Sequence, residues 1–165
     1  ECASRNGYSL RRNILQEMGA RLKLYGYVYD GYAAHINTLQ SYYDRSMELL
    51  STAVRQALFC PQRPVYGKEN DSPSGYIDPD GGCVNSLIAD GCDIRGSVKN
   101  CILFRNVRIE RGASVENCIL FKDTVVKKGA SLHSVITDKY VTVSENVILT
   151  GHERYPMVVA KGVTV

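Results

Sequence analysis

The sequence predicts a mainly β protein, in which a parallel β-helix of hexapeptide repeats follows an α/β segment. Three observations carry this prediction. A four-residue motif recurs at intervals of 15 and then 17 residues, as NSLI from Asn85 and as NCIL from Asn100 and Asn117. Aliphatic residues recur in steps of five, six and six residues through the same half of the chain. A proline- and glycine-rich stretch, 60–82, separates that half from a tyrosine-rich first part. A fixed short period is typical of a repeat architecture.

The aliphatic steps define a coil with three sides. The ten inward positions are Val98, Leu103, Ile109, Val115, Leu120, Val126, Leu132, Thr137, Val143 and Leu149. Only Thr137 among them is polar. The residue two places before each inward position is small or β-branched, as at Cys101, Val107 and Ala113. We therefore expect each side to be a short strand whose inward residue fills a narrow core, with tight corners between the sides.

A helical alternative for this half does not fit. It would need apolar residues at i, i+3, i+4 and i+7, and that spacing is absent. Glycines at Gly112 and Gly129 also mark turns rather than a continuous helix. Hexapeptide repeats of this kind form parallel β-helices, and coils of that class are left-handed.

Six cysteines fit the repeat better than they fit a disulfide framework or a zinc site, because their spacing contains no C-x-x-C pair. Cys92, Cys101 and Cys118 occupy small corner positions, and Cys83 occupies an inward position. A free cysteine behaves there as a small hydrophobic residue. Unpaired thiols agree with a reducing compartment and predict a cytoplasmic protein.

The composition argues against several classes of function. The 165 residues are 44% hydrophobic and 22% charged, an ordinary composition for a soluble globular protein. A net charge of +3 is too small to indicate nucleic-acid binding. No apolar run approaches the roughly 20 residues of a membrane span, and the first residues lack the pattern of a signal peptide. Because the chain does not begin with Met, we expect it to be a piece of a longer protein.

The first part of the chain carries both helical and strand patterns. Apolar residues at helical spacing predict helices, and the alternating tyrosines of KLYGYVYD predict a strand. The expected elements are a helix over 9–20 capped by Ser9, strands over 23–30 and 32–36, and helices over 38–50 and 51–59. So few residues cannot easily form an independent α/β domain, and we expect 1–59 to be the tail of a larger one. The linker then covers 60–82 and the β-helix domain 83–165.

The order of features resembles a known family. YGYVYDGY, SYYDRSMELL, a proline-rich linker with PVY, the block VNSLIADGCDIRGSVKNCILFRNVRI and a final GHERYP follow one another. This order resembles the C-terminal part of bacterial glucose-1-phosphate adenylyltransferase (ADP-glucose pyrophosphorylase), and most closely its GlgD-type regulatory subunit. The resemblance implies that 1–59 is the tail of a nucleotidyltransferase domain. It also implies that the β-helix assembles subunits into a homo- or hetero-oligomer with a catalytic pyrophosphorylase subunit.

The same resemblance sets expectations about chemistry. The family joins ATP and glucose 1-phosphate to give ADP-glucose and pyrophosphate with Mg²⁺, in glycogen biosynthesis. Its glycine-rich nucleotide loop has no counterpart in this chain, so we expect no cofactor here and assign no catalytic residue. Catalytic subunits carry W-x-D-V-G-T, whose aspartate ligates the metal. This chain has AAHINT from Ala33, with His35 at the position of the aspartate. A neutral imidazole is a poor Mg²⁺ ligand, so the resemblance implies a weakly catalytic or silent subunit.

Other hypotheses remain beside this one. A hexapeptide-repeat acyltransferase would use His133 as general base, and a fully active pyrophosphorylase would work despite His35. Asn85, Asn100 and Asn117 form either a ligand-binding ladder or, as we favour, a turn-stabilising one, since Asn tolerates left-handed backbone. Lys161, in VVAKG, matches a lysine that contributes to activator binding in plant relatives, which implies a phosphorylated-metabolite effector.

The remaining cations have a plain interpretation and a functional one. Arg95, Arg105, Arg108, Arg111, Lys122, Lys127 and Lys128 lie at turns and outward positions of the predicted coil. A solvated face is the favoured interpretation, and an anionic effector site is the alternative.

Overall fold

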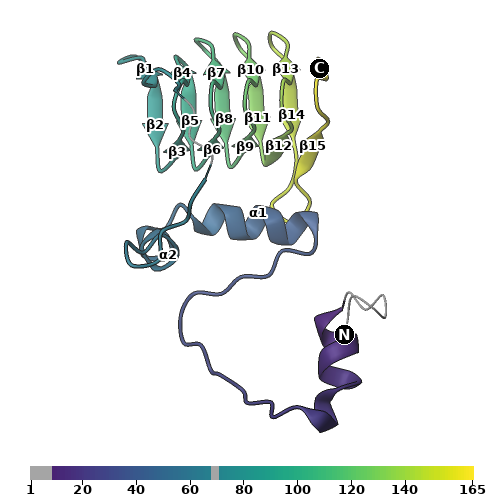
Figure 1. Cartoon of the computed structure of the whole chain (residues 1–165). Coiled ribbons are helices and arrows are strands. Elements are labelled where there is room, and N and C mark those ends of the chain that lie inside the picture. Colours follow the sequence, from purple (N-terminus) through teal and green to yellow (C-terminus); the bar gives the residue numbers. More distant parts are fainter. Residues whose placement is uncertain (1–8, 68–70) are drawn as a thin grey trace. The chain divides into compact units, whose positions relative to one another are not determined.

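The computed structural model describes residues 9–67 and 71–165 (Figure 1). It divides into two compact units, one that ends at Gly31 and one that spans Tyr32–Val165. Helices are few and strands are short and numerous. No helix in the described ranges is long and apolar enough to cross a membrane.

The first unit holds a π-helix, η2 (Leu10–Gln16), and a 3₁₀ helix, η3 (Gly19–Arg21). The predicted cap is confirmed, because the Ser9 hydroxyl accepts a hydrogen bond from the Arg12 backbone N–H at 3.2 Å. The helix itself is shorter than expected and wound differently. A π-helix is a rare form that usually appears in short pieces.

The predicted strands over 23–30 and 32–36 are wrong, because both stretches are extended without strand pairing. Tyr25 and Tyr27 are 89% and 88% exposed. A strand is stable only when its backbone N–H and C=O groups find a neighbouring strand. Within the described residues these stretches have none. The α/β character expected for the first part is therefore not seen there.

Two helices open the second unit, at the positions that the sequence predicts. Helix α1 (Leu39–Glu48) begins at Thr38, whose hydroxyl accepts from the Ser41 backbone N–H at 3.0 Å. The Ser41 hydroxyl in turn accepts from the Thr38 backbone N–H at 2.9 Å, which completes a capping box. Helix α2 (Thr52–Leu58) follows directly.

Fifteen short strands of the described chain form three parallel, five-stranded sheets (Figure 1). Sheet A contains β1 (Tyr76–Ile77), β4 (Asp93–Ile94), β7 (Arg108–Ile109), β10 (Val125–Val126) and β13 (Thr142–Val143). Sheet B contains β2 (Gly82–Val84), β5 (Ser97–Lys99), β8 (Ser114–Glu116), β11 (Ser131–His133) and β14 (Ile148–Thr150). Sheet C contains β3 (Leu87–Ile88), β6 (Ile102–Leu103), β9 (Ile119–Leu120), β12 (Val135–Thr137) and β15 (Met157–Val159). Each sheet is one side of the coil, and the fold prediction of a hexapeptide-repeat, left-handed parallel β-helix is confirmed.

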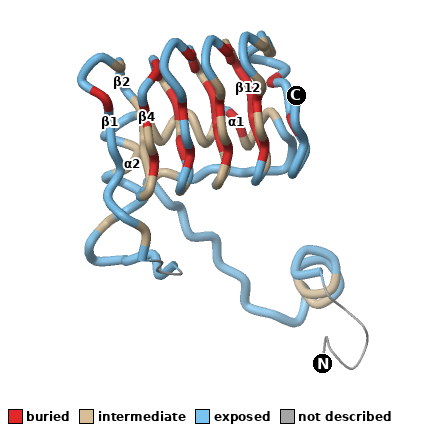
Figure 2. Tube along the Cα trace, turned by 90° about the horizontal axis from the view of Figure 1, so that it is seen from above, coloured by how far each residue is buried: buried red, intermediate tan, exposed pale blue. Residues whose placement is uncertain are grey.

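The strand register reproduces the predicted period. Val98 pairs with Val115 and Leu103 with Leu120, each 17 residues later. Nine of the ten predicted inward residues, from Val98 to Val143, are at most 1% exposed, and Leu149 packs against this core at its end. In Figure 2 the buried stretches recur from coil to coil along the β-helix. The small corner residues, including Cys101, are buried as well.

The coil begins earlier than the predicted boundary at residue 83. Strand β1 lies inside the segment 60–82 that was expected to be a linker, and it pairs in register with β4. The backbone of Tyr76 donates to the Cys92 carbonyl at 2.7 Å, as in the later coils. The surrounding prolines and glycines hide this strand in the sequence.

Helix α1 covers the outer face of sheet C. Tyr43 from the helix forms a buried cluster with Ile119 and Ile136 from the sheet. A loop between β14 and β15 interrupts the regular steps and reaches the helix, where Gln40 Nε2 donates to the Glu153 carbonyl at 2.7 Å. Helix, loop and sheet C thus form one packed layer.

Candidate functional site

A ladder of asparagine side chains runs across the coils at the corner between sheets B and C. Asn85 Nδ2 donates to Asn100 Oδ1 at 2.8 Å, and Asn100 Nδ2 donates to Asn117 Oδ1 at 3.2 Å. All three residues have positive φ, of 44°, 51° and 53°. Asparagine tolerates this left-handed backbone, which most side chains avoid. The ladder therefore occupies positions that the tight corners require.

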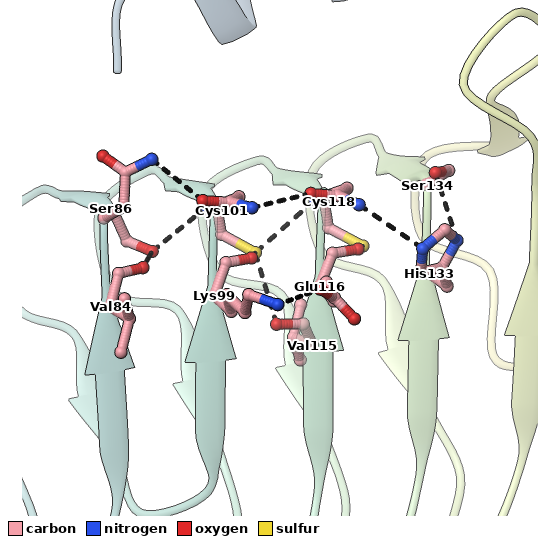
Figure 3. Close-up of polar contacts among 12 residues, drawn as sticks. Val84, Ser86, Lys99, Cys101, Val115, Glu116, Cys118, His133 and Ser134 are labelled. Atoms are coloured by element: carbon pink, nitrogen blue, oxygen red, sulfur yellow. Dashed lines mark hydrogen bonds and ion pairs between the residues drawn. The ribbon is translucent and has the colours of Figure 1, made fainter. Parts of the chain in front are cut away.

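His133 extends this ladder by one coil (Figure 3). Its Nε2 lies 3.3 Å from Asn117 Nδ2, and its Nδ1 lies 3.2 Å from the Ser134 hydroxyl. With the amide as donor, Nε2 accepts and Nδ1–H donates to Ser134. Both ring nitrogens are thus engaged inside the protein. A general base needs an acceptor nitrogen that reaches the substrate, so this arrangement gives the acyltransferase hypothesis no support.

The acidic neighbour of His133 is engaged elsewhere. Glu116 pairs with His133 in the register of β8 and β11. Its carboxylate, however, accepts from Lys99 Nζ at 2.8 Å, and that hydrogen bond lowers the pKa of Glu116. Among the described residues, no direct hydrogen bond joins the Glu116 carboxylate to the His133 imidazole, whose partners are Asn117 and Ser134. Lys99, Glu116 and His133 form a row of polar side chains, one per coil, along sheet B.

Two buried cysteines lie beside the ladder. The Cys118 backbone N–H donates to Cys101 Sγ at 3.5 Å, and the Val135 N–H donates to Cys118 Sγ at 3.4 Å. Burial raises the pKa of the Cys118 thiol. Both thiols are fully buried and out of reach of solvent, so Cys101 and Cys118 fill corners as the sequence predicts. The five described cysteines are free thiols, and Cys2 lies outside the described residues.

A second column of side chains is cationic and lies at the corner between sheets C and A. Arg105, Lys122 and Lys139 follow one another at 17-residue intervals, one per coil. Thr142 forms a parallel β-bridge with Thr164, 22 residues later. Lys161 follows Lys139 by the same 22 residues, so it continues the column. The four residues Arg105, Lys122, Lys139 and Lys161 are called the basic corner below.

Aromatic residues support the basic corner. Lys122 Nζ lies 5.3 Å and Lys161 Nζ 5.7 Å from the centroid of the Tyr140 ring. Hydrogen bonding to Tyr140, and after it to Asp123, raises the pKa of Lys122. A cavity of about 410 Å³ adjoins the corner, with stacked Phe104 and Phe121 in its wall. Lys139 lines this cavity with Arg105 and Lys122. Clustered cations of this kind suit phosphate groups.

Sequence reasoning named Lys161 as a candidate effector residue but did not name Lys139, its neighbour in this column. The 17-residue interval from Lys122 to Lys139 is the signal that could have found it, because residues one full coil apart stack. The link to Lys161 could not be found in this way, since the inserted loop before β15 lengthens the last interval to 22 residues.

His35 lies in the extended stretch before α1 and is exposed. An exposed imidazole without carboxylate neighbours does not fit Mg²⁺, which prefers oxygen ligands. No group of three or more potential metal ligands occurs among residues 9–67 and 71–165.

Comparison with known proteins identifies one relative that matches nearly the whole chain and others that match part of it. The chain is 42% identical to the glycogen biosynthesis protein GlgD of Bacillus subtilis (strain 168) over 159 residues, 96% of this chain and 46% of that protein. It is 46% identical over 68 residues to GlgD of Geobacillus stearothermophilus, covering 41% of this chain and 20% of that protein. It is also 36% identical over 90 residues to a glucose-1-phosphate adenylyltransferase of Acetivibrio thermocellus, covering 54% of this chain and 21% of that protein. The chain thus spans less than half the length of these relatives.

The β-helix also matches a family of domains by itself. The family of GlmU-like C-terminal hexapeptide domains matches residues 75–164, which is more than half of the chain and begins just before β1. The match agrees with the early start of the coil seen in the structure. By this match and by its coiled fold, the chain belongs to the family of GlmU-like C-terminal hexapeptide domains.

Proposed function

We propose that the chain is the C-terminal part of a GlgD-type subunit of glucose-1-phosphate adenylyltransferase, and that it serves assembly and regulation in cytoplasmic glycogen biosynthesis. The observation that carries the proposal is the 42% identity to a GlgD protein along 96% of this chain. Such identity over both the helical part and the β-helix supports a common architecture.

The proposal assigns no chemical step to this chain. His35 stands where the family's catalytic subunits carry a metal-binding aspartate, and an imidazole replaces oxygen poorly at Mg²⁺. ATP and Mg²⁺ then belong to the catalytic partner. We expect the chain alone to form no ADP-glucose, and an assay of the full-length subunit with and without a catalytic partner separates this expectation from a fully active enzyme.

Assembly is proposed to use uncovered faces of the coil. Sheet B has exposed apolar side chains at its two ends, with Val84 58% and Ile148 74% exposed. Co-purification of the tagged chain with a catalytic glucose-1-phosphate adenylyltransferase subunit tests the association. We expect Ile148→Lys to weaken it and Val65→Lys, a matched control outside the coil that is 68% exposed in the wild type, to leave it unchanged. Absence of any complex with the wild-type chain contradicts the assignment.

The basic corner is the proposed site of a phosphorylated effector. One cation per coil, with Arg105, Lys122 and Lys139 lining the same cavity, supports this role. In the assembled enzyme, we expect Lys139→Gln with Lys161→Gln to abolish the response of activity to inorganic phosphate. Lys23→Gln, an exposed cation in the first unit, is the control. An unchanged response in the double variant contradicts the site but leaves the assembly role standing.

A second candidate function is acyl transfer by a hexapeptide-repeat domain. The observation that favours it is the match to GlmU-like hexapeptide domains alone, since both ring nitrogens of His133, the candidate base, are engaged within the protein. His133→Ala tests it directly. Loss of an acyltransferase activity in this variant supports the candidate, and unchanged behaviour in every assay removes it.

A further inference from the structure

The outward face of sheet A carries a groove of about 310 Å³ with mainly cationic walls. Ile94 and Ile109 point into the core, so their neighbours in β4 and β7 face outward. The groove is lined by Asp93, Arg95, Arg108, Ile109, Glu110, Arg111 and Lys128. Four cations and two carboxylates leave these residues with an excess of two positive charges.

Arg95 is held in one orientation by Asp93. Its Nε and Nη2 atoms donate to Oδ1 and Oδ2 of that carboxylate, each at 2.9 Å. This pairing uses one edge of the planar guanidinium and leaves the N–H groups of the Nη1 end unused by Asp93. The Arg95 side chain is 51% exposed. The exposed Nη1 end of the Arg95 guanidinium therefore offers N–H donors in a fixed orientation to a second anion.

Arg111 is anchored in the same manner by Asp78. Its Nε and Nη2 atoms donate to Asp78 Oδ2 at 3.3 and 2.8 Å. The Asp78 side chain is 5% exposed, whereas that of Arg111 is 67% exposed. A buried carboxylate thus holds an exposed guanidinium. Hydrogen bonding from Arg111 lowers the pKa of Asp78, so the anchor stays ionised at neutral pH.

The two anchored guanidinium groups lie within each other's electric field. Asp78 raises the pKa of Arg111, and the charge of Arg95 opposes that change. Both residues line the same groove, and like charges on one groove wall repel each other. An anion that contacts both relieves the repulsion and meets donors that need no reorganisation.

Arg108 and Lys128 add two further cations to the groove. Arg108, in β7, pairs in register with Asp93, in β4. Arg95 follows directly after β4, and Arg111 lies in the turn after β7. The backbone N–H of Lys128 donates to Glu110 Oε2 at 2.9 Å, which ties the turn after β10 to the strand end of β7. Within the described ranges, the side chains of Arg108 and Lys128 form no ion pair.

We propose that this groove binds a compact polyanion with two phosphate or phosphonate groups. Arg95 and Arg111 each take one group end-on, and Arg108 and Lys128 contact the oxygens that remain. Paired guanidinium forks recognise phosphate with two parallel hydrogen bonds each. The inference does not depend on the assignment to glycogen synthesis, and it uses none of the residues of the basic corner.

Titration of the full chain with methylenediphosphonate tests the proposal, with inorganic phosphate as the probe that carries a single group. Calorimetry measures affinity, and ¹⁵N–¹H spectra of the arginine Nε groups locate the contact. We expect the Arg95 and Arg111 signals to shift. We expect the diphosphonate to bind at least about tenfold more tightly than phosphate, since each charge-assisted fork contributes on the order of a tenfold factor. Equal affinity for the two probes overturns the two-fork arrangement.

Variants separate the groove from general surface charge. Arg108→Gln combined with Lys128→Gln is expected to weaken diphosphonate binding by at least about tenfold. Lys127→Gln is the control. It removes one positive charge at the residue next to Lys128, and Lys127 does not line the groove. We expect it to weaken binding less than about threefold, through screened long-range attraction alone. The site is overturned if the control and the groove variant weaken diphosphonate binding equally for each charge removed. It is also overturned if the wild-type chain does not bind the diphosphonate.

Discussion

The Tyr43 hydroxyl donates a 2.7 Å hydrogen bond to the backbone carbonyl of Asn117, 74 residues later in the chain. This bond ties helix α1 to the asparagine ladder at the corner of the coil. Tyr43 is 4% exposed, and burial raises its pKa, so the hydroxyl remains a neutral donor. The contact joins the helical part of the second unit to its β-helix in a way that no short-range pattern describes.

Tyr43→Phe removes this donor and leaves the Asn117 carbonyl without the bond. We expect a loss of about 1–2 kcal/mol in the free energy of unfolding, the usual cost of an unmade hydrogen bond in a buried place. Urea denaturation followed by circular dichroism measures it. Tyr25→Phe, at a residue that is 89% exposed, serves as the control and should leave the midpoint unchanged. Equal stability of Tyr43→Phe and the wild type contradicts the assigned role.

Thr137 is the polar exception among the inward residues, and its hydroxyl lies 3.1 Å from that of Thr124. Both residues are fully buried. Thr124→Val strands the Thr137 hydroxyl and should cost about 1–2 kcal/mol. The double change to valine should come close to the wild type, because replacing both partners with apolar groups of similar shape is nearly neutral. A double-mutant cycle by urea denaturation checks this, and simple additivity of the two single changes contradicts it.

Asn117 combines a positive φ of 53° with hydrogen bonds on both sides of the ladder. Asn117→Ala loses both contributions, whereas Asn117→Gly keeps the backbone freedom and loses only the side-chain bonds. We expect Ala to be less stable than Gly by about 1 kcal/mol, the cost of left-handed backbone for a residue with Cβ. Denaturation midpoints of the two variants give the comparison. If Ala matches Gly, the corner does not depend on left-handed backbone.

Asp78 should make the stability of the coil sensitive to acid. Hydrogen bonding from Arg111 lowers the pKa of Asp78 below its ordinary value of 3.8. A carboxyl group with a lowered folded-state pKa stabilises the protein above its unfolded pKa and loses that effect as pH falls through the folded value. The contribution is therefore complete above about pH 5 and disappears progressively below 3.8.

Unfolding midpoints from pH 7 to pH 2 measure this dependence. Asp78→Asn should be less stable than the wild type at neutral pH, and the difference should shrink below pH 3.8. Asp30→Asn, in the first unit, controls for the loss of one negative charge. A constant difference between Asp78→Asn and the wild type at every pH contradicts the linkage.

The repeat was predictable because its cause is local. Each coil returns a residue to the same place after 17 steps, so Val98, Val115 and Leu132 must all be apolar to fill one narrow core. Corner cysteines are small for the same reason. The capped helix after Thr38 was also predictable, since its signal lies within one turn of chain.

The strands expected at 23–30 and 32–36 failed for the opposite reason. Alternating tyrosines show that a stretch is suited to a sheet, but a sheet exists only where another strand supplies backbone partners. Strand β1 shows the converse, because a weak local pattern at Tyr76 becomes a strand beside β4.

The sequence by itself determined the architecture of the coil, because a short period imposes the same burial on every turn. It also placed Asn85, Asn100 and Asn117 on one line. Only the tertiary structure decided which charges meet. The bridge from Asp78 to Arg111 and the approach of Lys161 to Tyr140 join residues from different coils, at distances set by the corners and by the loop before β15. Long side chains reach across several positions, so their partners depend on packing in space rather than on period.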